Sequence, residues 1–361
     1  MKLKKIALWT AGVCAGIVAV AALALWATTY HPEAVQPERM VCAATASVLE
    51  PGQTVKVLSW NVQYMAGKQY VFFYDLFDGS GPDERPSPGE ITKTFNEVAR
   101  VIRSENPDII LIQEIDDGSK RTDYENQLAR LLSLLPAEYS CYSDSYYWKA
   151  SFVPHPRIMG KVGMKLAVIS KYKIGAATRY QLELIPADPV TKQLNFKRAV
   201  LEVRFPVQGA KDFVVMTTHL DAFAQGSNTM ERQVAQVRSL LDGLSAAGNP
   251  WIIGGDFNLL PPGPSYTLLP SDQRVYFNET TELSLITDRY RSVPSLSEIN
   301  GPARDAWFTH FPNDPAAKNP DRAIDYLFMS DTVKIGKHYI RQKDARAISD
   351  HFPLVAEIVL P

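Results

Sequence analysis

The sequence has almost no net charge and lacks two motifs that often identify nucleotide-binding proteins and hydrolases. Its 38 lysines and arginines against 39 aspartates and glutamates leave a net charge of −1. This balance argues against a protein that holds nucleic acid chiefly through charge, although a local basic patch stays open. The sequence contains no P-loop. It also contains no G-x-S-x-G motif, which disfavours a Ser-His-Asp hydrolase.

Cysteine is scarce, with three residues in a chain of 361. Cys14 lies in an apolar segment, where we expect a packing role. Cys42 and Cys141 lie outside that segment, and a disulfide between them could persist if this part of the chain is exported. The sequence does not show that the two are close enough to bond. A disulfide and two free thiols therefore remain equal alternatives.

A long uncharged run, residues 6–27, separates the N-terminus from the rest of the chain. It is long enough to cross a bilayer, for which roughly 20 apolar residues are needed. The preceding Lys2, Lys4 and Lys5 predict a single-pass protein with a cytoplasmic N-terminus and the remainder outside the cytoplasm, periplasmic or extracellular. A cleaved signal peptide is the alternative, but its apolar region would be only about 7–15 residues. We therefore expect residues 1–27 to be a retained transmembrane anchor.

The rest of the chain is long and apolar enough for a large core, since 46% of all residues are hydrophobic. Residues 28–53 have no clear period and are expected to be a tether, followed by a catalytic domain over 54–361. Apolar patterning in that domain predicts a mixed order of strands and helices, typical of two packed sheets with helices outside. The expected strands cover 55–62, 108–114, 165–170, 196–204, 212–218, a segment from Trp251, 323–329 and 353–359, and the expected helices cover 88–105, 123–135 and 229–246.

Several of these apolar strands begin or end in a side chain that can bind a metal or transfer a proton. Any one of them has a structural explanation, such as a turn cap, but their recurrence at strand ends suggests that they converge on one rim of the sheets. Carboxylates and amides of this kind suit Mg²⁺, and the absence of cysteine from the set argues against structural zinc. The residues are Asn61, Glu114, His219, Asp221, Asp256, Asn258, Asp325, Asp350 and His351.

The segments "SWNV", "IQE", "THLD", "GGDFN", "IDYLF" and "SDHFP", in this order, resemble those of the endonuclease/exonuclease/phosphatase superfamily. The superfamily includes DNase I, exonuclease III-like nucleases and neutral sphingomyelinases. The resemblance covers about residues 55–360. It implies an α/β fold, a four-layer sandwich of two mixed β-sheets flanked by helices (DNase I-like), here preceded by one transmembrane helix. It also implies phosphoester hydrolysis that depends on a divalent metal.

The resemblance implies a metal-binding role for three residues. Glu114 matches the principal metal ligand, with Asn61 beside it, and Asp350 is a further candidate for the metal. The implied cofactor is Mg²⁺ or Mn²⁺.

The same resemblance implies catalytic roles for five others. Asp256 would orient or deprotonate the attacking water, and Asn258 would steady that water or the phosphate. His351 would donate to a phosphoryl oxygen, and Asp325 would fix its tautomer. His219 would be a second histidine at the phosphate.

Family membership does not name the substrate. The anchor and the aromatic run "YVFFYDLF" (70–77) favour phosphoesters of lipid head groups, with Tyr146, Tyr147 and Trp148 as further aromatics near a bilayer. The alternative for these aromatics is that they cover an edge of the sandwich. An exported nuclease is the alternative function, less favoured because no basic cluster interleaves with the aromatics, and a non-catalytic phosphate-binding relative is a further alternative. The oligomeric state is not predicted.

Two positions and one motif depart from the superfamily pattern. The signature "WLGDLNYR" of the inositol phosphatases is absent, and "IIGGDFNLLP" stands in its place. Asp221 matches no universal position, so it either supports the site or caps the loop after His219. Arg198 could reach a phosphate but is expected to be an ordinary surface arginine of a strand.

Overall fold

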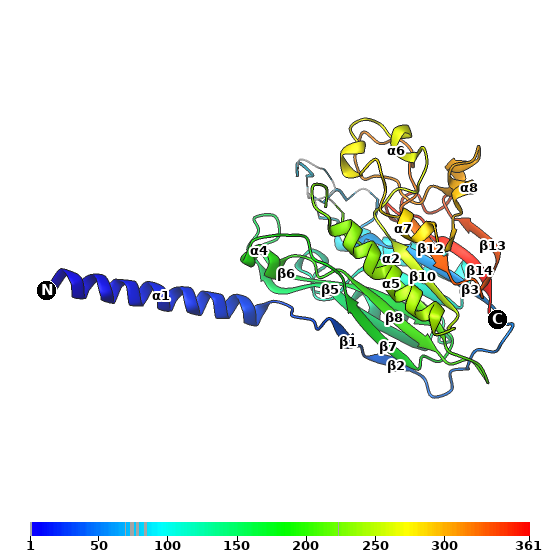
Figure 1. Ribbon diagram of the computed structural model, residues 1–361, viewed down its shortest axis with the longest axis horizontal. Coiled ribbons are helices and arrows are strands. Elements are labelled where there is room, and N and C mark those ends of the chain that lie inside the picture. Colours follow the sequence, from blue (N-terminus) through cyan, green and yellow to red (C-terminus); the bar gives the residue numbers. More distant parts are fainter. Residues whose placement is uncertain (1, 69, 73–75, 77–78, 83–84, 223) are drawn as a thin grey trace.

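The computed structural model describes residues 2–68, 70–72, 76, 79–82, 85–222 and 224–361 (Figure 1). Two seven-stranded mixed sheets pack face to face, with helices on their outer faces, which confirms the predicted α/β sandwich. The first sheet has the order β13 (Lys334–Ile340), β14 (Leu354–Val359), β3 (Thr54–Asn61), β4 (Ile109–Asp116), β6 (Gly160–Ser170), β5 (Cys141–Val153) and β2 (Met40–Cys42). The second has the order β1 (Val35–Pro37), β7 (Ala176–Gln181), β8 (Ala199–Phe205), β9 (Phe213–His219), β10 (Trp251–Asp256), β12 (Asp325–Met329) and β11 (Arg291–Val293).

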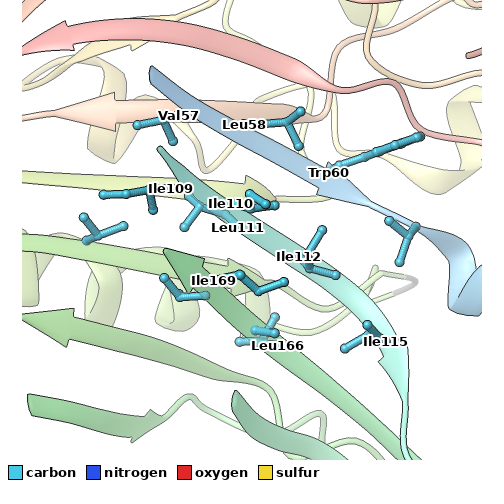
Figure 2. Close-up of a cluster of buried hydrophobic side chains, with 14 of the residues drawn as sticks. Val57, Leu58, Trp60, Ile109, Ile110, Leu111, Ile112, Ile115, Leu166 and Ile169 are labelled. Atoms are coloured by element: carbon cyan, nitrogen blue, oxygen red, sulfur yellow. The ribbon is translucent and has the colours of Figure 1, made fainter. Parts of the chain in front are cut away.

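Each sheet has a parallel pair of strands near its centre. β3 runs parallel to β4, and β9 runs parallel to β10. These strands are buried on both faces and are rich in β-branched and other apolar residues, as parallel strands usually are. Figure 2 shows buried apolar side chains of the first sheet, with Leu58 and Trp60 of β3 beside their cross-strand neighbours Ile110 and Ile112 of β4. Burial of these side chains is the main stabilising contribution to the sandwich.

The helices α2 (Pro88–Glu105) and α5 (Thr229–Ala246) are the long helices of the folded body, and both match the predicted ranges. Ser87 caps α2: its hydroxyl accepts a hydrogen bond from the N–H of Glu90, and the Glu90 carboxylate accepts one from the N–H of Ser87, the predicted capping box. The apolar side of α5 packs on the second sheet through Val234, Val237 and Leu241.

The expected helix over 123–135 is shorter, as α3 (Gln127–Leu134), because Asp123 and Tyr124 adopt left-handed backbone angles. The remaining helices are short: α4 (Pro189–Leu194), α6 (Ser265–Leu268), α7 (Ser284–Thr287) and α8 (Leu296–Ile299), with 3₁₀ turns at Gln63–Met65, Lys120–Thr122, Arg274–Tyr276 and Arg304–Trp307.

The N-terminal helix α1 (Lys2–Thr28) extends away from the folded body (Figure 1). Within the described residues, one helix, Lys4–Thr28, is long and apolar enough to cross a membrane, a test that a signal sequence also passes. The segment expected to be a tether, 28–53, contributes β1 to one sheet and β2 to the other. Cys42 and Cys141 are cross-strand partners and form a disulfide, which decides between the two alternatives left by the sequence.

Candidate active site

The topology brings the ends of several strands to one edge between the two sheets. β3, β4, β9 and β10 place Asn61, Glu114, His219 and Asp256 at or next to their carboxyl ends. β12 runs antiparallel to β10, so its first residue, Asp325, is the cross-strand partner of Asp256. The candidate residues, which are far apart in the sequence, therefore lie together at this edge. This is the usual position of a binding site in an α/β protein.

His351 and Asp350 reach the same edge from the segment before β14. Leu354 of β14 pairs with Ser59 of β3, close to the end of that strand. The backbone carbonyl of His351 accepts a hydrogen bond from the indole of Trp60 at 2.9 Å, and the Ser349 hydroxyl donates to the carbonyl of Asn61 at 2.8 Å. These contacts fix the segment against β3.

Two glycines allow close packing beside Asp256, Gly254 against the opposite sheet and Gly255 against the neighbouring strand β9. A Cβ on Gly254 would lie 2.8 Å from Leu111 Cδ1 of the opposite sheet. Gly255 has φ +150°, and a Cβ there would lie 2.0 Å from the carbonyl oxygen of Thr218. Only glycine fits at 255, where the close atoms belong to the backbone, whereas a side chain at 254 would require Leu111 and Leu327 to shift.

Asn61 joins two carboxylates. Its side-chain N–H group donates to Glu114 Oε1 and to Asp256 Oδ2, both at 3.1 Å. Its side-chain oxygen accepts the backbone N–H of Gln63 at 3.0 Å, which fixes the direction of the amide. Asn61 therefore orients the two acids, and its predicted role as a metal ligand stays a prediction.

Asp256 lies between two histidines and has 1% of its surface exposed. Its Oδ2 is 3.4 Å from His351 Nε2 and 3.5 Å from His219 Nε2. The other nitrogen of His351, Nδ1, is 2.8 Å from Asp325 Oδ2. Since Nδ1 faces a carboxylate, it carries a proton, and Nε2 is directed toward Asp256.

The environment of Asn258 and His219 is also polar. The N–H of Asn258 donates to Asp256 Oδ1 at 2.9 Å, and its side chain donates to the carbonyl of Leu220 at 3.1 Å. His219 Nδ1 lies 3.4 Å from the Tyr147 hydroxyl and 3.7 Å from Glu114 Oε1. All eight residues predicted for the site thus lie in one connected group.

Asp350 belongs to this group through a second set of contacts. Ser349 donates to its Oδ1 at 3.2 Å and Asn313 donates to its Oδ2 at 3.0 Å. Among the described residues, the ligand-type atoms of His310, Asp350 and His351 lie within 4.8 Å of one another, as do those of Asp256, Asp325 and His351. Both groups could hold a metal ion.

Burial and mutual repulsion raise the pKa values of the acids at this edge. Burial raises the pKa of Asp256 to about 7, with further increases from the charges of Asp325 and Glu114. The pKa of Glu114 is raised by burial and by the charge of Asp350. Burial also raises the pKa of Asp350. Carboxylates whose pKa values are raised in this way are stabilised by a nearby cation or by protonation.

The two histidines beside Asp256 have opposite pKa shifts. Burial opposes the charged form of His351, but the charges of Asp325, Asp256 and Asp350 outweigh it and raise its pKa well above the usual value. Burial, with the charges of Arg198 and His351, lowers the pKa of His219 well below the usual value. His351 is therefore a proton donor and His219 a neutral imidazole near neutral pH.

All of the group except Asn61 and Asp325 lines a cavity of about 880 Å³. Its walls include apolar and aromatic side chains, among them Phe72, Trp148, Ile185 and Phe196. It is thus large enough for a small organic molecule or a lipid head group, since ligand pockets typically measure ≈ 300–1,000 Å³.

The structure corrects the interpretation of Arg198 and adds residues that the sequence analysis missed. Arg198 is 5% exposed and lines the cavity, so it is not a surface arginine. Its Nε donates to Asp221 at 3.0 Å, and Gln233 donates to the same carboxylate at 2.8 Å. Asp221 therefore supports the cavity wall. Arg121 and His310 also line the cavity, and no motif indicated them.

The aromatic run at 70–77 is described in part. Tyr70 and Phe72 are buried and pack with Tyr64, and Phe72 lines the cavity. Phe73, Tyr74 and Phe77 lie outside the described residues. Tyr147 is buried next to His219, so it belongs to the site interior instead of an exposed aromatic lip.

Two mixed sheets between helices, with acids and histidines at one edge, define a DNase I-like hydrolase. The profile of the Endonuclease/Exonuclease/phosphatase family matches residues 58–351, and the chain belongs to this family. No curated protein matches the sequence at a significant level.

Solved structures confirm the fold. An endonuclease/exonuclease/phosphatase from Beutenbergia cavernae is 21% identical, with a TM-score of 0.56 over 85% of this chain and 72% of that one. The protein of the same description from Bacteroides vulgatus is 15% identical, with a TM-score of 0.52 over 86% and 100%. The catalytic domain of human Nocturnin, solved with a sulfate anion, is 16% identical, with a TM-score of 0.51 over 89% and 96%.

Proposed function

We propose that this protein is a divalent-metal-dependent phosphoester hydrolase, anchored by α1, that acts on the head-group phosphoesters of lipids outside the cytoplasm. The observation that carries the catalytic part is the position of Asp256, which is buried between His219 and His351 and has its pKa raised to about 7. A buried carboxylate poised near neutral pH beside a protonated histidine suits activation of water together with protonation of a phosphoryl oxygen.

In this proposal Asp256 accepts a proton from the attacking water, and Asn258 holds that water or the phosphate. His351, protonated and held by Asp325 at 2.8 Å, donates a hydrogen bond to a phosphoryl oxygen as negative charge develops there. The neutral His219 contacts a second phosphoryl oxygen. The two histidines would thus flank the phosphorus on the side where Asp256 lies.

The residues fit a divalent cation. Glu114 and Asp350 are partly exposed acids with raised pKa values, and the charge of Asp350 contributes to the raised pKa of Glu114. A nearby cation would therefore stabilise both acids. Their hard oxygen atoms suit Mg²⁺ or Mn²⁺, with Asn61 adjacent. When bound, such an ion would stabilise negative charge on the phosphoryl group.

Two observations support an exported catalytic domain that stays attached to a membrane. α1 carries no charged residue after Lys5, and no part of its candidate span is buried against the rest of the protein. The disulfide between Cys42 and Cys141 suits an oxidising compartment. The domain boundary at residue 54 and the orientation of α1 form part of the proposal. Reporter fusions placed after residue 50 test it: activity of the reporter only in the cytoplasm would reverse the topology.

Lipid substrates are favoured because the end of α1 lies beside the cavity walls. α1 contacts α4 and β5 (Figure 1). Both elements lead to the cavity, because Trp148 of β5 and Phe196, which follows α4, line its wall. A chain held in a bilayer at this end would keep the cavity near lipid head groups.

The test is a panel assay on the full-length protein in detergent with Mg²⁺. The substrates are bis-p-nitrophenyl phosphate, plasmid DNA, sphingomyelin-type lipids and phosphatidylinositols, and Asp256→Asn is the matched inactive control. We expect turnover of the soluble diester and preferential turnover of lipids. Preferential cleavage of DNA would establish the nuclease alternative. No turnover of any substrate by the parent protein, together with phosphate binding, would establish a non-catalytic relative.

A further inference from the structure

The residue at which α1 ends is fixed to two elements of the folded body. Thr29 directly follows α1 and forms a bridge with Ala150 of β5. Its hydroxyl donates to the carbonyl of Leu25 at 2.8 Å and lies 3.5 Å from the side-chain oxygen of Gln193 of α4. The 27 residues of α1 span about 40 Å, close to the ~40–45 Å of a bilayer with its head groups. With α1 spanning the bilayer, as proposed above, Thr29 and with it Ala150 and Gln193 would lie at the level of the head groups.

Aromatic residues at this point suit the same level. Trp26 is 59% exposed and stacks on His31 at 5.1 Å between ring centres. Tyr30 packs against Tyr146 of β5 at 6.2 Å. Tryptophan and tyrosine favour the interface between hydrocarbon and water. The pairing of Tyr30 with Tyr146 also holds the body against the end of α1.

Exposed apolar side chains surround the same point. Phe152 is 47% exposed and follows Ala150 by two residues, about 7 Å along β5. Met159 is 50% exposed in the turn that joins β5 to β6. Val190 of α4 is 54% exposed and precedes Gln193 by three residues, about 4.5 Å along the helix. Exposed apolar side chains this close to the end of α1 would contact the bilayer surface.

Cations accompany these apolar residues. Lys149, Arg157 and Lys192 are exposed on the same segments, and Asp188, the N-cap of α4, is an acid among them. Arg157, with His155 and Pro156 of the same turn, also lines the cavity. Apolar residues with lysine and arginine around them are the composition of surfaces that bind at a lipid interface.

We propose that Phe152, Met159 and Val190, with Lys149, Arg157 and Lys192, form a membrane-docking surface. This surface seats the body on the bilayer that α1 spans and turns the mouth of the cavity toward its head groups. The partner is the lipid surface itself, on the side where α1 ends. The proposal deepens the proposed function and rests on it for the direction of α1.

The first test measures insertion and does not depend on catalysis. Full-length protein with Cys14→Ala and Met159→Cys carries an environment-sensitive fluorophore at residue 159. It is reconstituted into vesicles of phosphatidylcholine and phosphatidylglycerol with and without nitroxide-labelled lipid. The control is Val48→Cys in the same background, because Val48 is 40% exposed and lies beyond the other end of β5, about 30 Å from Ala150. We expect loss of most of the fluorescence at 159 and little loss at 48. Equal signals would overturn the docking surface.

The second test separates docking from chemistry. The variant with Phe152→Ser, Met159→Ser and Val190→Ser is expected to lose most activity on lipid in vesicles while keeping its activity on soluble bis-p-nitrophenyl phosphate. The matched control, Met40→Ser with Val48→Ser, changes exposed apolar residues at the far end of β5 and should retain both activities. Unchanged hydrolysis of vesicle lipid by the first variant would contradict the docking surface. If the parent protein hydrolyses no phosphodiester at all, the proposed function is wrong, and the quenching result alone decides on docking.

Discussion

Two buried carboxylates of this protein have opposite pKa shifts. Glu105, at the end of α2, accepts hydrogen bonds from Lys56 at 2.7 Å, Arg341 at 2.8 Å and Tyr339 at 2.5 Å. Burial alone would raise its pKa, but these donors outweigh burial and lower it. Asp256 is also buried, but among the described residues it forms no ion pair with lysine or arginine, and burial raises its pKa to about 7.

The difference separates an acid that stabilises the fold from one that is available for chemistry. The charge of Glu105 is satisfied within the protein, so a ligand gains nothing by approaching it. The acids around Asp256 repel one another, and the protonated His351 offsets this only in part, since the pKa values of Asp256, Glu114 and Asp350 stay raised. A metal ion or a proton therefore lowers their energy. The predictions below test whether the two clusters behave in these two ways, beginning with the largest expected effect.

Metal removal should abolish activity and leave the Glu105 cluster unaffected. We expect no measurable turnover of bis-p-nitrophenyl phosphate in EDTA and full recovery with Mg²⁺ or Mn²⁺. Because a cation would offset the repulsion between Glu114 and Asp350, the metal should also raise the thermal midpoint. Full activity in chelator would contradict the assignment of these acids to a metal.

Asp256→Asn and His351→Ala should each lower kcat by about 10²-fold or more, as loss of acid–base and electrostatic groups usually does. In Asp256→Asn the amide keeps one oxygen that can accept the N–H groups of Asn61 and Asn258, so the thermal midpoint, measured beside kcat, should not fall below that of the parent. If Asp256 merely caps a turn through Asn258, its loss would cost about 1 kcal/mol of stability and leave turnover intact. A destabilised but fully active Asp256→Asn enzyme would establish that role.

Asp325→Asn should lower kcat about tenfold to a hundredfold, because it removes the carboxylate that orients His351 at 2.8 Å. The loss should not add to that of His351→Ala in the double variant, since Asp325 acts through that imidazole. Additive losses would show that Asp325 acts independently of His351.

Glu105→Gln should lower the stability of the protein and leave kcat unchanged, the opposite of the variants above. It leaves Lys56 without its charged acceptor and removes one of the two acceptors of Arg341, which keeps Asp344, at a cost of about 2 kcal/mol in the free energy of unfolding. Urea unfolding measures this cost, and kcat should stay at the parent value. A large loss of kcat would show that the two clusters are coupled.

The site could be predicted from the sequence more completely than the fold. Its eight residues are polar side chains at the ends of strongly apolar strands, and this pattern can be recognised within a short segment of sequence. By contrast, β5 escaped prediction because its inward positions include Ser143 and Ser145, which are buried on hydrogen bonds to Arg39 and Glu38. Periodicity of apolar residues does not report a strand whose buried side chains are polar.

Residues whose role depends on a distant partner were missed for a related reason. Arg198 looked like a surface residue at the start of a strand, yet the register of β8 and β9 brings it opposite Leu220, beside Asp221. The sequence does contain a signal for this ion pair, because Arg198 and Asp221 carry opposite charges at the ends of two successive strands. That signal identifies a contact only when the two strands are known to be neighbours. His310 lies in a long irregular segment, and no local pattern identifies it.

The smallest expected effect is a difference in how stability depends on pH. The pKa of Asp256 is raised from 3.8 to about 7, so the folded state holds its proton more tightly than the unfolded state does. Stability must therefore fall as pH rises from about 4 to about 7, whereas Asp256→Asn removes this penalty. The lowered pKa of Glu105 acts in the other window, because its stabilisation is present above the unfolded value of 4.5 and is lost only as pH falls further. In metal-free protein, the thermal midpoint of Asp256→Asn should rise relative to that of the parent as the pH increases from about 5 to about 8. Over the same range, the thermal midpoint of Glu105→Gln should stay below that of the parent by a constant amount. Parallel curves for Asp256→Asn and the parent would show that the charge of Asp256 is already compensated in the folded protein, and the contrast between the two acids would then be wrong.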